Sequence, residues 1–313
     1  MKAAVLHEHG AAPRLDDFED PVPSDGHAVA EVGAAGINHL DLLKASGGFY
    51  TGPPPLPSVV GSDGVGRLAD GRRVFFDATV APHGAMAERT LVREDTLLDV
   101  PEGVPDEFAA ALGNSGLGAW LALEWRAGLK AGETVLVLGA TGAMGTIALQ
   151  AAKALGAGRV VAAARAGERL PRTLERGADA VVELDSESDP AAALQEATGG
   201  ADVIIDPLWG HPGLAAMEAA AHGARHVQLG QMAGTTLELP APLVRGKALN
   251  VLGFAFFHAP LEVRRDAYAK LMDLAARGEL QMDIESVPLS RIRDAWERQR
   301  EGPHTKLVVV PGA

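Results

Sequence analysis

Cysteine is absent from all 313 residues of the chain. Its absence excludes disulfide bonds, thiol nucleophiles and every zinc or iron–sulfur site that depends on thiolate ligands. Chains without disulfides suit a reducing compartment, so we expect the protein to work in the cytoplasm.

Basic charge is also scarce, since 28 Lys and Arg residues face 41 Asp and Glu residues and the net charge is −13. Without a basic block, neither nucleic acid nor an anionic membrane surface is an expected partner. Apolar runs are interrupted by Gly, Pro or charged residues well before the roughly 20 residues that a membrane span needs. Hydrophobic residues make up 47% of the chain and charged residues 22%, which is ordinary for a soluble globular enzyme.

The pattern of strands and helices changes near residue 109. Before it the chain is β-rich, with short strands separated by Pro- and Gly-rich turns. After it strand-like and helical segments alternate, which predicts a right-handedly wound parallel sheet covered on both faces. We therefore predict an α/β fold in which a doubly wound Rossmann domain (109–249) is inserted in a β-rich domain formed by residues 1–108 and 250–313. The predicted strands are 3–6, 28–32, 64–68, 73–76, 88–92, 134–138, 159–164, 180–184, 202–206, 224–229 and 306–310.

Residues 134–158 are the most informative segment. A short apolar run ends at Leu138, glycines follow at 139, 142 and 145, and an alanine-rich amphipathic stretch begins at once. This order predicts a strand, a tight turn and a helix, whose N-terminal N–H groups and dipole suit a pyrophosphate. The spacing Gly-x-x-Gly-x-x-Gly also fits an ordinary strand-to-helix turn, so the triplet alone is a weak signal. The cofactor contacts expected in this turn are Gly139, Thr141, Gly142, Ala143, Met144 and Gly145.

The end of the next predicted strand indicates which dinucleotide is bound. An acid there would bind the 2′-hydroxyl of NAD, whereas an arginine would receive the 2′-phosphate of NADP. This strand has no acid at its end and is followed by Arg165 and Arg169. The planar guanidinium matches a phosphate in two-point geometry. We therefore expect NADPH as the cofactor; the alternative is that both arginines are solvated loop residues.

Two further loops follow the predicted strands 202–206 and 224–229. Ligands of a doubly wound sheet lie over the carboxyl ends of its strands, so we expect these loops to line the cofactor through Leu208 and Gly230. Phe254 is expected to contact a ring of the cofactor or substrate, with core packing as the alternative. We expect His222 and His226, which flank a glycine between a helix and a strand, at the surface.

A set of short motifs extends in one order over the whole chain. They lie at 35–41, 56–66, 71–74, 83–88, 129–137, 201–206 and 302–309, together with the glycine turn. With these motifs the chain resembles the medium-chain dehydrogenase/reductase superfamily, in particular its zinc-independent, quinone-oxidoreductase-like branch. The resemblance implies that the β-rich domain is GroES-like and that hydride is transferred from a nicotinamide cofactor.

The zinc-dependent members of this superfamily bind a catalytic metal through a Cys, a His and a second Cys. By the resemblance, Asn38, Ser62 and Asn114 stand at those positions here. Neutral Asn and Ser are poor zinc ligands, so replacement of all three ligands leaves no tetrahedral zinc site. We expect no metal, and a carbonyl must then be polarised by hydrogen-bond donors or by the cofactor itself.

Three residues are the catalytic candidates: Asn38, Asp41 and Tyr50. In the quinone-reductase branch the asparagine that matches Asn38 sits beside the nicotinamide, where its amide could donate to a substrate or nicotinamide oxygen. Asn38 could also be the N-cap of a helix over 38–46, and Asp41 a first-turn residue favoured by the helix dipole. Many members of the branch carry a tyrosine after an Arg-x-Gly pattern and use it as a proton donor or substrate contact, and Tyr50 resembles this tyrosine. The match is imperfect, because Phe49 stands at the position of the tyrosine, Tyr50 is one position later, and Ala45 replaces the arginine.

The expected function is an NADPH-dependent reductase that transfers hydride to a quinone or an α,β-unsaturated carbonyl without a metal. Conjugation in such acceptors spreads the incoming negative charge onto an oxygen that a few donors can stabilise. The alternatives are reduction of saturated aldehydes or ketones, or a non-catalytic NADPH-binding sensor or partner protein. The apolar segment 249–253 would close one edge of the sheet, and the resemblance implies that this edge pairs with its copy in a homodimer.

Overall fold

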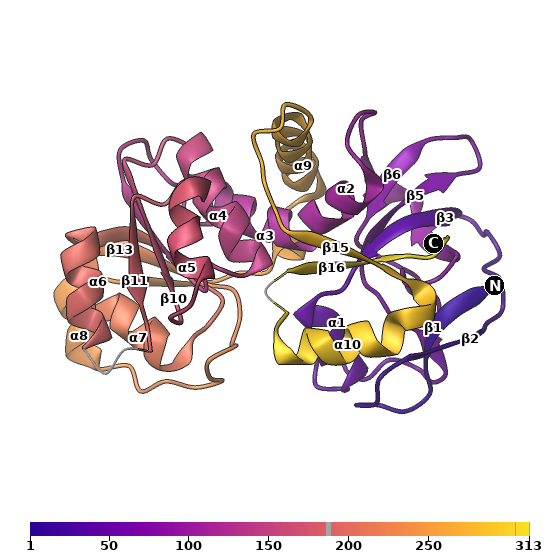
Figure 1. Ribbon diagram of the computed structural model, residues 1–313, viewed down its shortest axis with the longest axis horizontal. Helices are drawn as coiled ribbons and strands as arrows, with labels where there is room; N and C mark the ends of the chain where they lie inside the picture. Colours follow the sequence, from indigo (N-terminus) through magenta and orange to yellow (C-terminus); the bar gives the residue numbers. More distant parts are fainter. Residues whose placement is uncertain (186–188, 304, 313) are drawn as a thin grey trace. The chain divides into compact units, whose positions relative to one another are not determined.

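The computed structural model describes residues 1–185, 189–303 and 305–312, and Figure 1 labels its helices and strands. The chain forms two compact units. The terminal unit consists of Met1–Asn114 and Tyr268–Ala313, and the central unit consists of Ser115–Ala267.

A six-stranded parallel sheet is the core of the central unit. Its strands are β9 (Thr134–Leu138), β10 (Arg159–Ala164), β11 (Ala180–Glu183), β12 (Ala201–Asp206), β13 (Ala220–Gln228) and β14 (Asn250–Gly253). In space their order is β11-β10-β9-β12-β13-β14. The chain thus starts in the middle of the sheet, winds outward to one edge, and returns to wind toward the other. The predicted doubly wound sheet is therefore confirmed.

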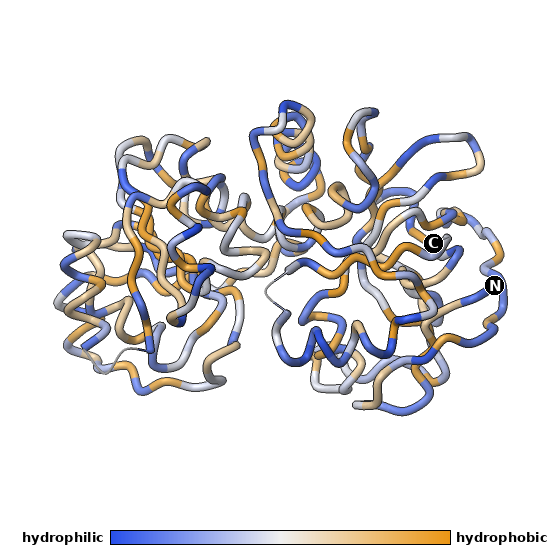
Figure 2. Tube along the Cα trace, in the orientation of Figure 1, coloured by the Kyte–Doolittle hydropathy of each residue, from blue (hydrophilic) through white to orange (hydrophobic). Residues whose placement is uncertain are grey.

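The helices of this unit lie between successive strands of the sheet, except the first helix and its extension, which precede β9. The helices are α3 (Asn114–Leu121) with a π-helical extension (Ala122–Arg126), α4 (Ala143–Ala154), α5 (Arg169–Arg172), α6 (Pro190–Thr198), α7 (Gly210–Glu218) and α8 (Ala241–Lys247). The central strands are apolar without alternation, because both faces of the sheet are covered. Residues 135–138 of β9 and 160–163 of β10, for example, are 0% exposed. Figure 2 shows these strands as orange segments between paler or blue loops.

The terminal unit is rich in antiparallel strands. They are β1 (Lys2–Leu6), β2 (Arg14–Asp17), β3 (His27–Gly36), β4 (Ser58–Val59), β5 (Gly64–Leu68), β6 (Arg73–Phe76), β7 (Arg89–Arg93), β8 (Leu98–Asp99), β15 (Ile284–Pro288) and β16 (Lys306–Val310). One sheet has the order β15-β16-β3-β5-β6-β8, with β7 also paired to β3, and a smaller sheet has the order β2-β1-β4. The helices are α1 (His39–Ala45), α2 (Asp106–Leu112) and α10 (Ile292–Glu301), while α9 (Leu261–Ala276) crosses the division between the units.

The C-terminal tail is part of this β-rich unit. Strand β16 pairs antiparallel with β3, with Val308 opposite Gly36, and parallel with β15. Helix α10 covers the core with an apolar stripe at helical spacing that includes Ile292, Ala295 and Trp296. Its remaining residues are mostly charged and appear blue in Figure 2.

Two details differ from the predicted boundaries and strands. Strand β14 pairs with β13, with Asn250 opposite Arg225, so this segment closes the edge of the central sheet as expected, whereas the domain boundary predicted between residues 249 and 250 separates it from that sheet. Strands β2, β4, β8 and β15 were not among the predicted strands. Each of them lies at the edge of its sheet, and β4 and β8 have two residues each. Strand β2 is Arg-Leu-Asp-Asp and has no apolar run. Within the described ranges, no helix combines the length and the apolar character that crossing a membrane requires.

Candidate functional site

The turn between β9 and α4 is shaped by its three glycines. Gly139 has a φ of +61°, which favours glycine. A Cβ on Gly145 would lie 2.4 Å from the carbonyl oxygen of Gly139, so only glycine lets the first turn of α4 pack here. Gly142 is the N-cap of the 12-residue helix α4, and a Cβ there would meet nothing closer than 3.4 Å. The helix thus begins at an open position without a side chain, which fits a dinucleotide pyrophosphate. Half-buried neighbours complete the turn: Thr141, Ala143 and Met144.

The loops after β12 and β13 are joined to each other. The N–H of Ala233 donates to the carbonyl oxygen of Leu208 at 2.8 Å. A Cβ on Gly230 would lie 2.6 Å from the carbonyl oxygen of Pro207, so this close approach requires glycine. Leu208 also borders the glycine turn, since its Cδ2 is 3.3 Å from where a Cβ of Gly139 would be. The structure therefore brings Leu208 and Gly230 to the end of the sheet that holds the glycine turn.

The end of β10 carries charges of both signs. Arg165 follows β10, Arg169 begins α5, and both are exposed. The N–H of Ala166 donates to Oδ1 of Asp185 at 2.7 Å. Asp185 follows β11, which pairs with β10. Reasoning along the sequence missed this acid because it belongs to the neighbouring strand. An arginine and a carboxylate thus lie at the strand ends where the sequence predicts contact with the 2′ group of a ribose.

Phe254 directly follows β14. Its N–H donates to the carbonyl oxygen of Gln228 at 2.9 Å, which continues the pairing with β13. The side chain is 7% exposed and lies against Trp125, with 5.9 Å between the ring centroids. This burial agrees with the packing alternative, and the contact of Phe254 with a ring of the cofactor or substrate stays a prediction.

In the terminal unit, Asn38 lies at the centre of a buried polar cluster. It is the N-cap residue of α1 and is 5% exposed. Its Nδ2 donates to the carbonyl oxygen of Gly36 at 3.2 Å and to Oδ1 of Asp63 at 2.7 Å. Its Oδ1 accepts a hydrogen bond from Nζ of Lys306. The amide thus connects a buried carboxylate to a buried ammonium, and donation to a substrate would require one of these bonds to break.

Asp41 and Ser62 extend the cluster toward the surface. The carboxylate of Asp41 accepts from the N–H of Asn38 at 2.8 Å and from Oγ of Ser62 at 2.7 Å. The half-buried Lys44 donates from Nζ to Oγ of Ser62 at 2.9 Å. Donors and acceptors run in one direction from Lys44 through Ser62 to Asp41, an order that permits proton transfer. We call these three residues the lysine–serine–aspartate arm.

Burial dominates the ionisation of the cluster. It raises the pKa of Asp63 to about 7, an effect that Lys306 opposes and that Asp41 increases. Burial also lowers the pKa of Lys306, which Asp63 and Asp41 oppose. Asp63 is 1% and Lys306 4% exposed, so each charge depends on the others for stabilisation.

Tyr50 lies at the surface beyond this arm. Its side chain is 69% exposed, and its ring lies against Phe49 with 3.9 Å between centroids. Nζ of Lys44 is 5.6 Å from the centroid of the buried Phe49 ring. Partial desolvation raises the pKa of Tyr50, so its phenol is protonated at neutral pH. The structure therefore brings Tyr50 near the arm through Phe49, although its register in sequence is one position late.

The positions that resemble zinc ligands are occupied by hydrogen-bonding side chains and backbone. At the third of them, the N–H of Asn114 donates to Oδ2 of Asp63 at 3.2 Å. No group of three or more His, Asp or Glu residues that could hold a metal ion occurs among the described residues.

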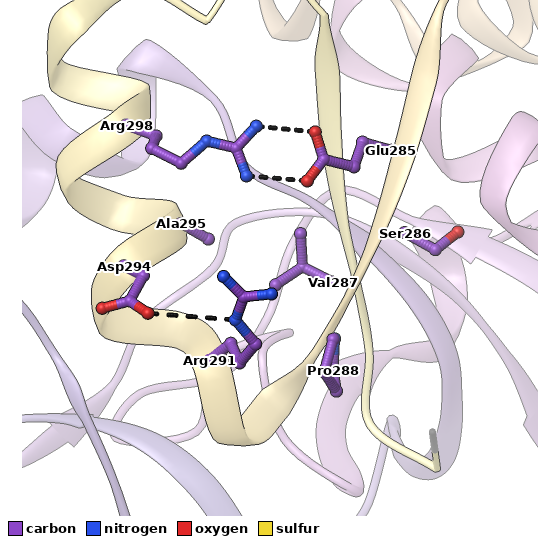
Figure 3. Close-up of a pocket in the computed structure, with 8 residues that line it drawn as sticks. All are labelled: Glu285, Ser286, Val287, Pro288, Arg291, Asp294, Ala295 and Arg298. Carbon is purple, nitrogen blue, oxygen red and sulfur yellow. Dashed lines mark hydrogen bonds and ion pairs between the residues drawn. The ribbon is translucent and has the colours of Figure 1, made fainter.

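A small cavity between β15 and α10 has a volume of about 20 Å³ (Figure 3). Arg298 and Glu285 form a two-point ion pair beside it, and Arg291 lies 3.8 Å from Asp294. The cavity has room for about one water molecule. It is therefore no candidate for a dinucleotide or a quinone.

The prediction that His226 lies at the surface is wrong. His226 is 0% exposed, whereas His222 is exposed. Strand β13 pairs with β12 on one side and with β14 on the other, so the middle of β13 is enclosed. Nε2 of His226 lies 2.8 Å from Oδ2 of the buried Asp206. No local pattern around either residue could have predicted this contact, because it depends on the order of the strands.

Comparison with known proteins finds similarity to dehydrogenases and quinone oxidoreductases. Residues 143–277 match the family described as "Zinc-binding dehydrogenase", a segment that does not include Asn38, Ser62 or Asn114. The chain is 30% identical to the quinone oxidoreductase of Pongo abelii over 95% of this chain and 93% of that protein.

Two solved structures are similar over 99% of this chain and 100% of theirs. The quinone oxidoreductase of Thermus thermophilus, which was also solved with NADPH, is 33% identical with a TM-score of 0.81. The quinone oxidoreductase of Escherichia coli, complexed with NADPH, has a TM-score of 0.90 at 24% identity and indicates the fold alone.

Proposed function

The chain belongs to the quinone oxidoreductase branch of the medium-chain dehydrogenase/reductase superfamily, and from this membership we propose an NADPH-dependent, metal-independent reductase of quinones or α,β-unsaturated carbonyls. The observation that carries the proposal is the glycine turn between β9 and α4, with its open helix N-terminus. The NADPH complex of the Thermus thermophilus relative supports the cofactor, and the names of the relatives support the acceptor.

The central unit would hold the cofactor. The first turn of α4 binds the pyrophosphate through backbone N–H groups and the helix dipole. Arg165 and Arg169 receive the 2′-phosphate, and Asp185 fixes the loop between them by accepting from Ala166. Leu208 and Gly230 border the remaining part of the dinucleotide. When bound, the nicotinamide supplies a hydride.

The terminal unit would supply the proton. Hydride addition to a quinone or enone leaves negative charge on an acceptor oxygen. Tyr50, an exposed and protonated phenol, donates the proton that forms the new O–H bond and takes one back from solvent. Asn38 and Asp41 act as positioning residues, because their polar atoms already bond to Lys306, Asp63 and Ser62.

A panel assay that follows NADPH absorbance tests the reaction. We expect turnover of quinones or enones with NADPH. Turnover of simple alcohols with NADP, with none of enones or quinones, would favour the aldehyde and ketone class instead. Tight NADPH binding without turnover of any electrophile would indicate a non-catalytic sensor or partner protein.

A substitution at Arg165 tests the cofactor. We expect R165A to weaken NADPH binding about tenfold to a hundredfold, the range for losing one charged hydrogen bond, and to leave NADH binding unchanged. Fluorescence titration with both cofactors measures this effect. Arg172, an exposed arginine at the end of α5, gives the matched control R172A. Wild-type protein that binds NADH as tightly as NADPH would contradict the assignment.

A further inference from the structure

Asp206 and His226 form a fully buried pair at the carboxyl end of β12. Both side chains are 0% exposed, and Nε2 of His226 lies 2.8 Å from Oδ2 of Asp206. Oδ1 of Asp206 accepts from the N–H of Leu208 at 2.7 Å and from that of Trp209 at 2.8 Å. Two backbone donors and one ring nitrogen thus converge on this side chain. This arrangement fits a carboxylate that accepts from a histidine carrying its hydrogen on Nε2.

The loop that Asp206 holds has an unusual backbone. Trp209 has φ +57° and ψ −157°, a conformation that residues with a side chain rarely adopt. Such a conformation persists only where the surrounding structure imposes it. The two hydrogen bonds from Leu208 and Trp209 to Asp206 do so here. On the other side, a Cβ on Gly213 would lie 2.7 Å from Oδ2 of Asp206, so α7 closes over the carboxylate.

Packing alone does not explain a histidine at position 226. Its Nδ1 is buried and has no hydrogen-bond partner among the described residues. An unpaired buried nitrogen is destabilising, and an apolar side chain would avoid it. The polar contribution of His226 is its bond to Asp206, and its ring also lies edge-on to the ring of Trp209, with 5.9 Å between the ring centroids.

The loop in question is the one that carries a predicted cofactor contact. Leu208 borders the glycine turn, and the N–H of Leu229 donates to the carbonyl oxygen of Asp206 at 2.8 Å. The side chain of Asp206 thus holds the loop that carries Leu208, and its backbone carbonyl joins the strand end that precedes Gly230.

We propose that His226 is a positioning residue for the cofactor: by donating to Asp206, it holds residues 207–210 in the strained shape that receives the dinucleotide. The inference rests on the proposed function, because it presupposes a dinucleotide at this end of the sheet. His226 acts through Asp206 and through its ring contact with Trp209, and it need not touch the cofactor.

Substitutions at position 226 in the full chain test the inference. H226L and H226M remove the donor, and the flexible methionine fills the same space if leucine disturbs folding. H226Q keeps an N–H donor. We expect H226L and H226M to raise the Kd for NADPH, measured by fluorescence, about tenfold, and H226Q to stay within about threefold of wild type.

A control separates positioning from general loss of stability. Val227, the next residue in β13, is 0% exposed and points away from this pair along the strand's alternation. V227A should lower the thermal unfolding midpoint without changing the Kd for NADPH. Equal affinity of H226L, H226M and wild type, or a loss in H226Q as large as in H226L, would overturn the inference. Wild-type protein that binds no dinucleotide would instead overturn the proposed function.

Discussion

Asn38 shows what one side chain contributes at the residue scale. Its amide accepts from Lys306 and donates to Asp63, two charged residues that lie far apart in the sequence. Asn38 stands at a position that resembles a zinc ligand of the metal-dependent members of the superfamily. In this chain the cation beside that position is the buried ammonium of Lys306. A neutral bridge between opposite charges satisfies both without bringing them into direct contact.

Replacing Lys306 should make stability strongly dependent on pH. We expect K306M to lower the free energy of unfolding by about 3–5 kcal/mol at pH 8, the usual effect of removing one partner of a buried pair. The loss should shrink as pH falls below 7, because burial already raises the pKa of Asp63 to about 7 and a protonated Asp63 needs no cation. Urea unfolding at pH 5.5, 7 and 8 measures the difference.

The direction of this pH dependence of stability follows from proton linkage. A carboxyl whose folded pKa lies above its unfolded value of about 4 binds more protons in the folded state, so stability falls as pH rises through this window. D63N removes that group and should flatten the pH dependence of both wild type and K306M. K130M, at an exposed lysine, is the control. A K306M deficit that stays constant between pH 5.5 and 8 would contradict the coupling.

At the element scale, the strand–turn–helix from β9 to α4 contains glycines that are needed for two different reasons. Gly145 is required by packing, since a Cβ would meet backbone atoms of Gly139 at 2.4 Å and Ala140 at 2.6 Å. Gly142 is not crowded, so its lack of a side chain matters for what approaches from outside. The two positions can therefore be separated by experiment.

Alanine at each position should give different results. We expect G145A to destabilise the protein by about 1–3 kcal/mol, as overpacking does, and to weaken NADPH binding. We expect G142A, at φ −80°, to change stability by less than about 1 kcal/mol while it weakens NADPH binding at least about tenfold. Thermal unfolding and fluorescence titration measure the two effects. If G142A binds NADPH as wild type does, the pyrophosphate does not lie over this turn.

At the scale of the whole molecule, β14 forms one edge of the central sheet, and no strand of the described residues pairs with its outer side. Val251 on that strand is 41% exposed. An exposed apolar edge strand is a template for pairing with another chain. A closed twofold pairing of two copies would cover it.

We therefore predict a homodimer that joins two central sheets through β14. Light scattering at micromolar concentration should give twice the mass of one chain, and V251K should shift the population toward monomer by placing a charge in the contact. V22K, at another exposed valine, is the control. A wild-type monomer at these concentrations would rule out the dimer.

Local sequence by itself determined the strand–turn–helix, the apolar strands of the central sheet and the exclusion of thiolate chemistry. These features depend on neighbours within a few residues, where periodicity and glycine have direct steric meaning. The order of the motifs along the chain indicated the family and predicted that the C-terminal tail returns to the N-terminal domain. Leu208 and Gly230 were predicted from their positions in the loops that follow two strands.

Tertiary structure alone decided which distant side chains meet. Lys306 reaches Asn38 across 268 positions because β16 lies beside β3, and Asp185 reaches Ala166 because β11 lies beside β10. His226 is buried for the same reason, since β13 is enclosed by β12 and β14. Hydrogen bonds between such residues depend on strand order and register, which no local pattern in the sequence contains.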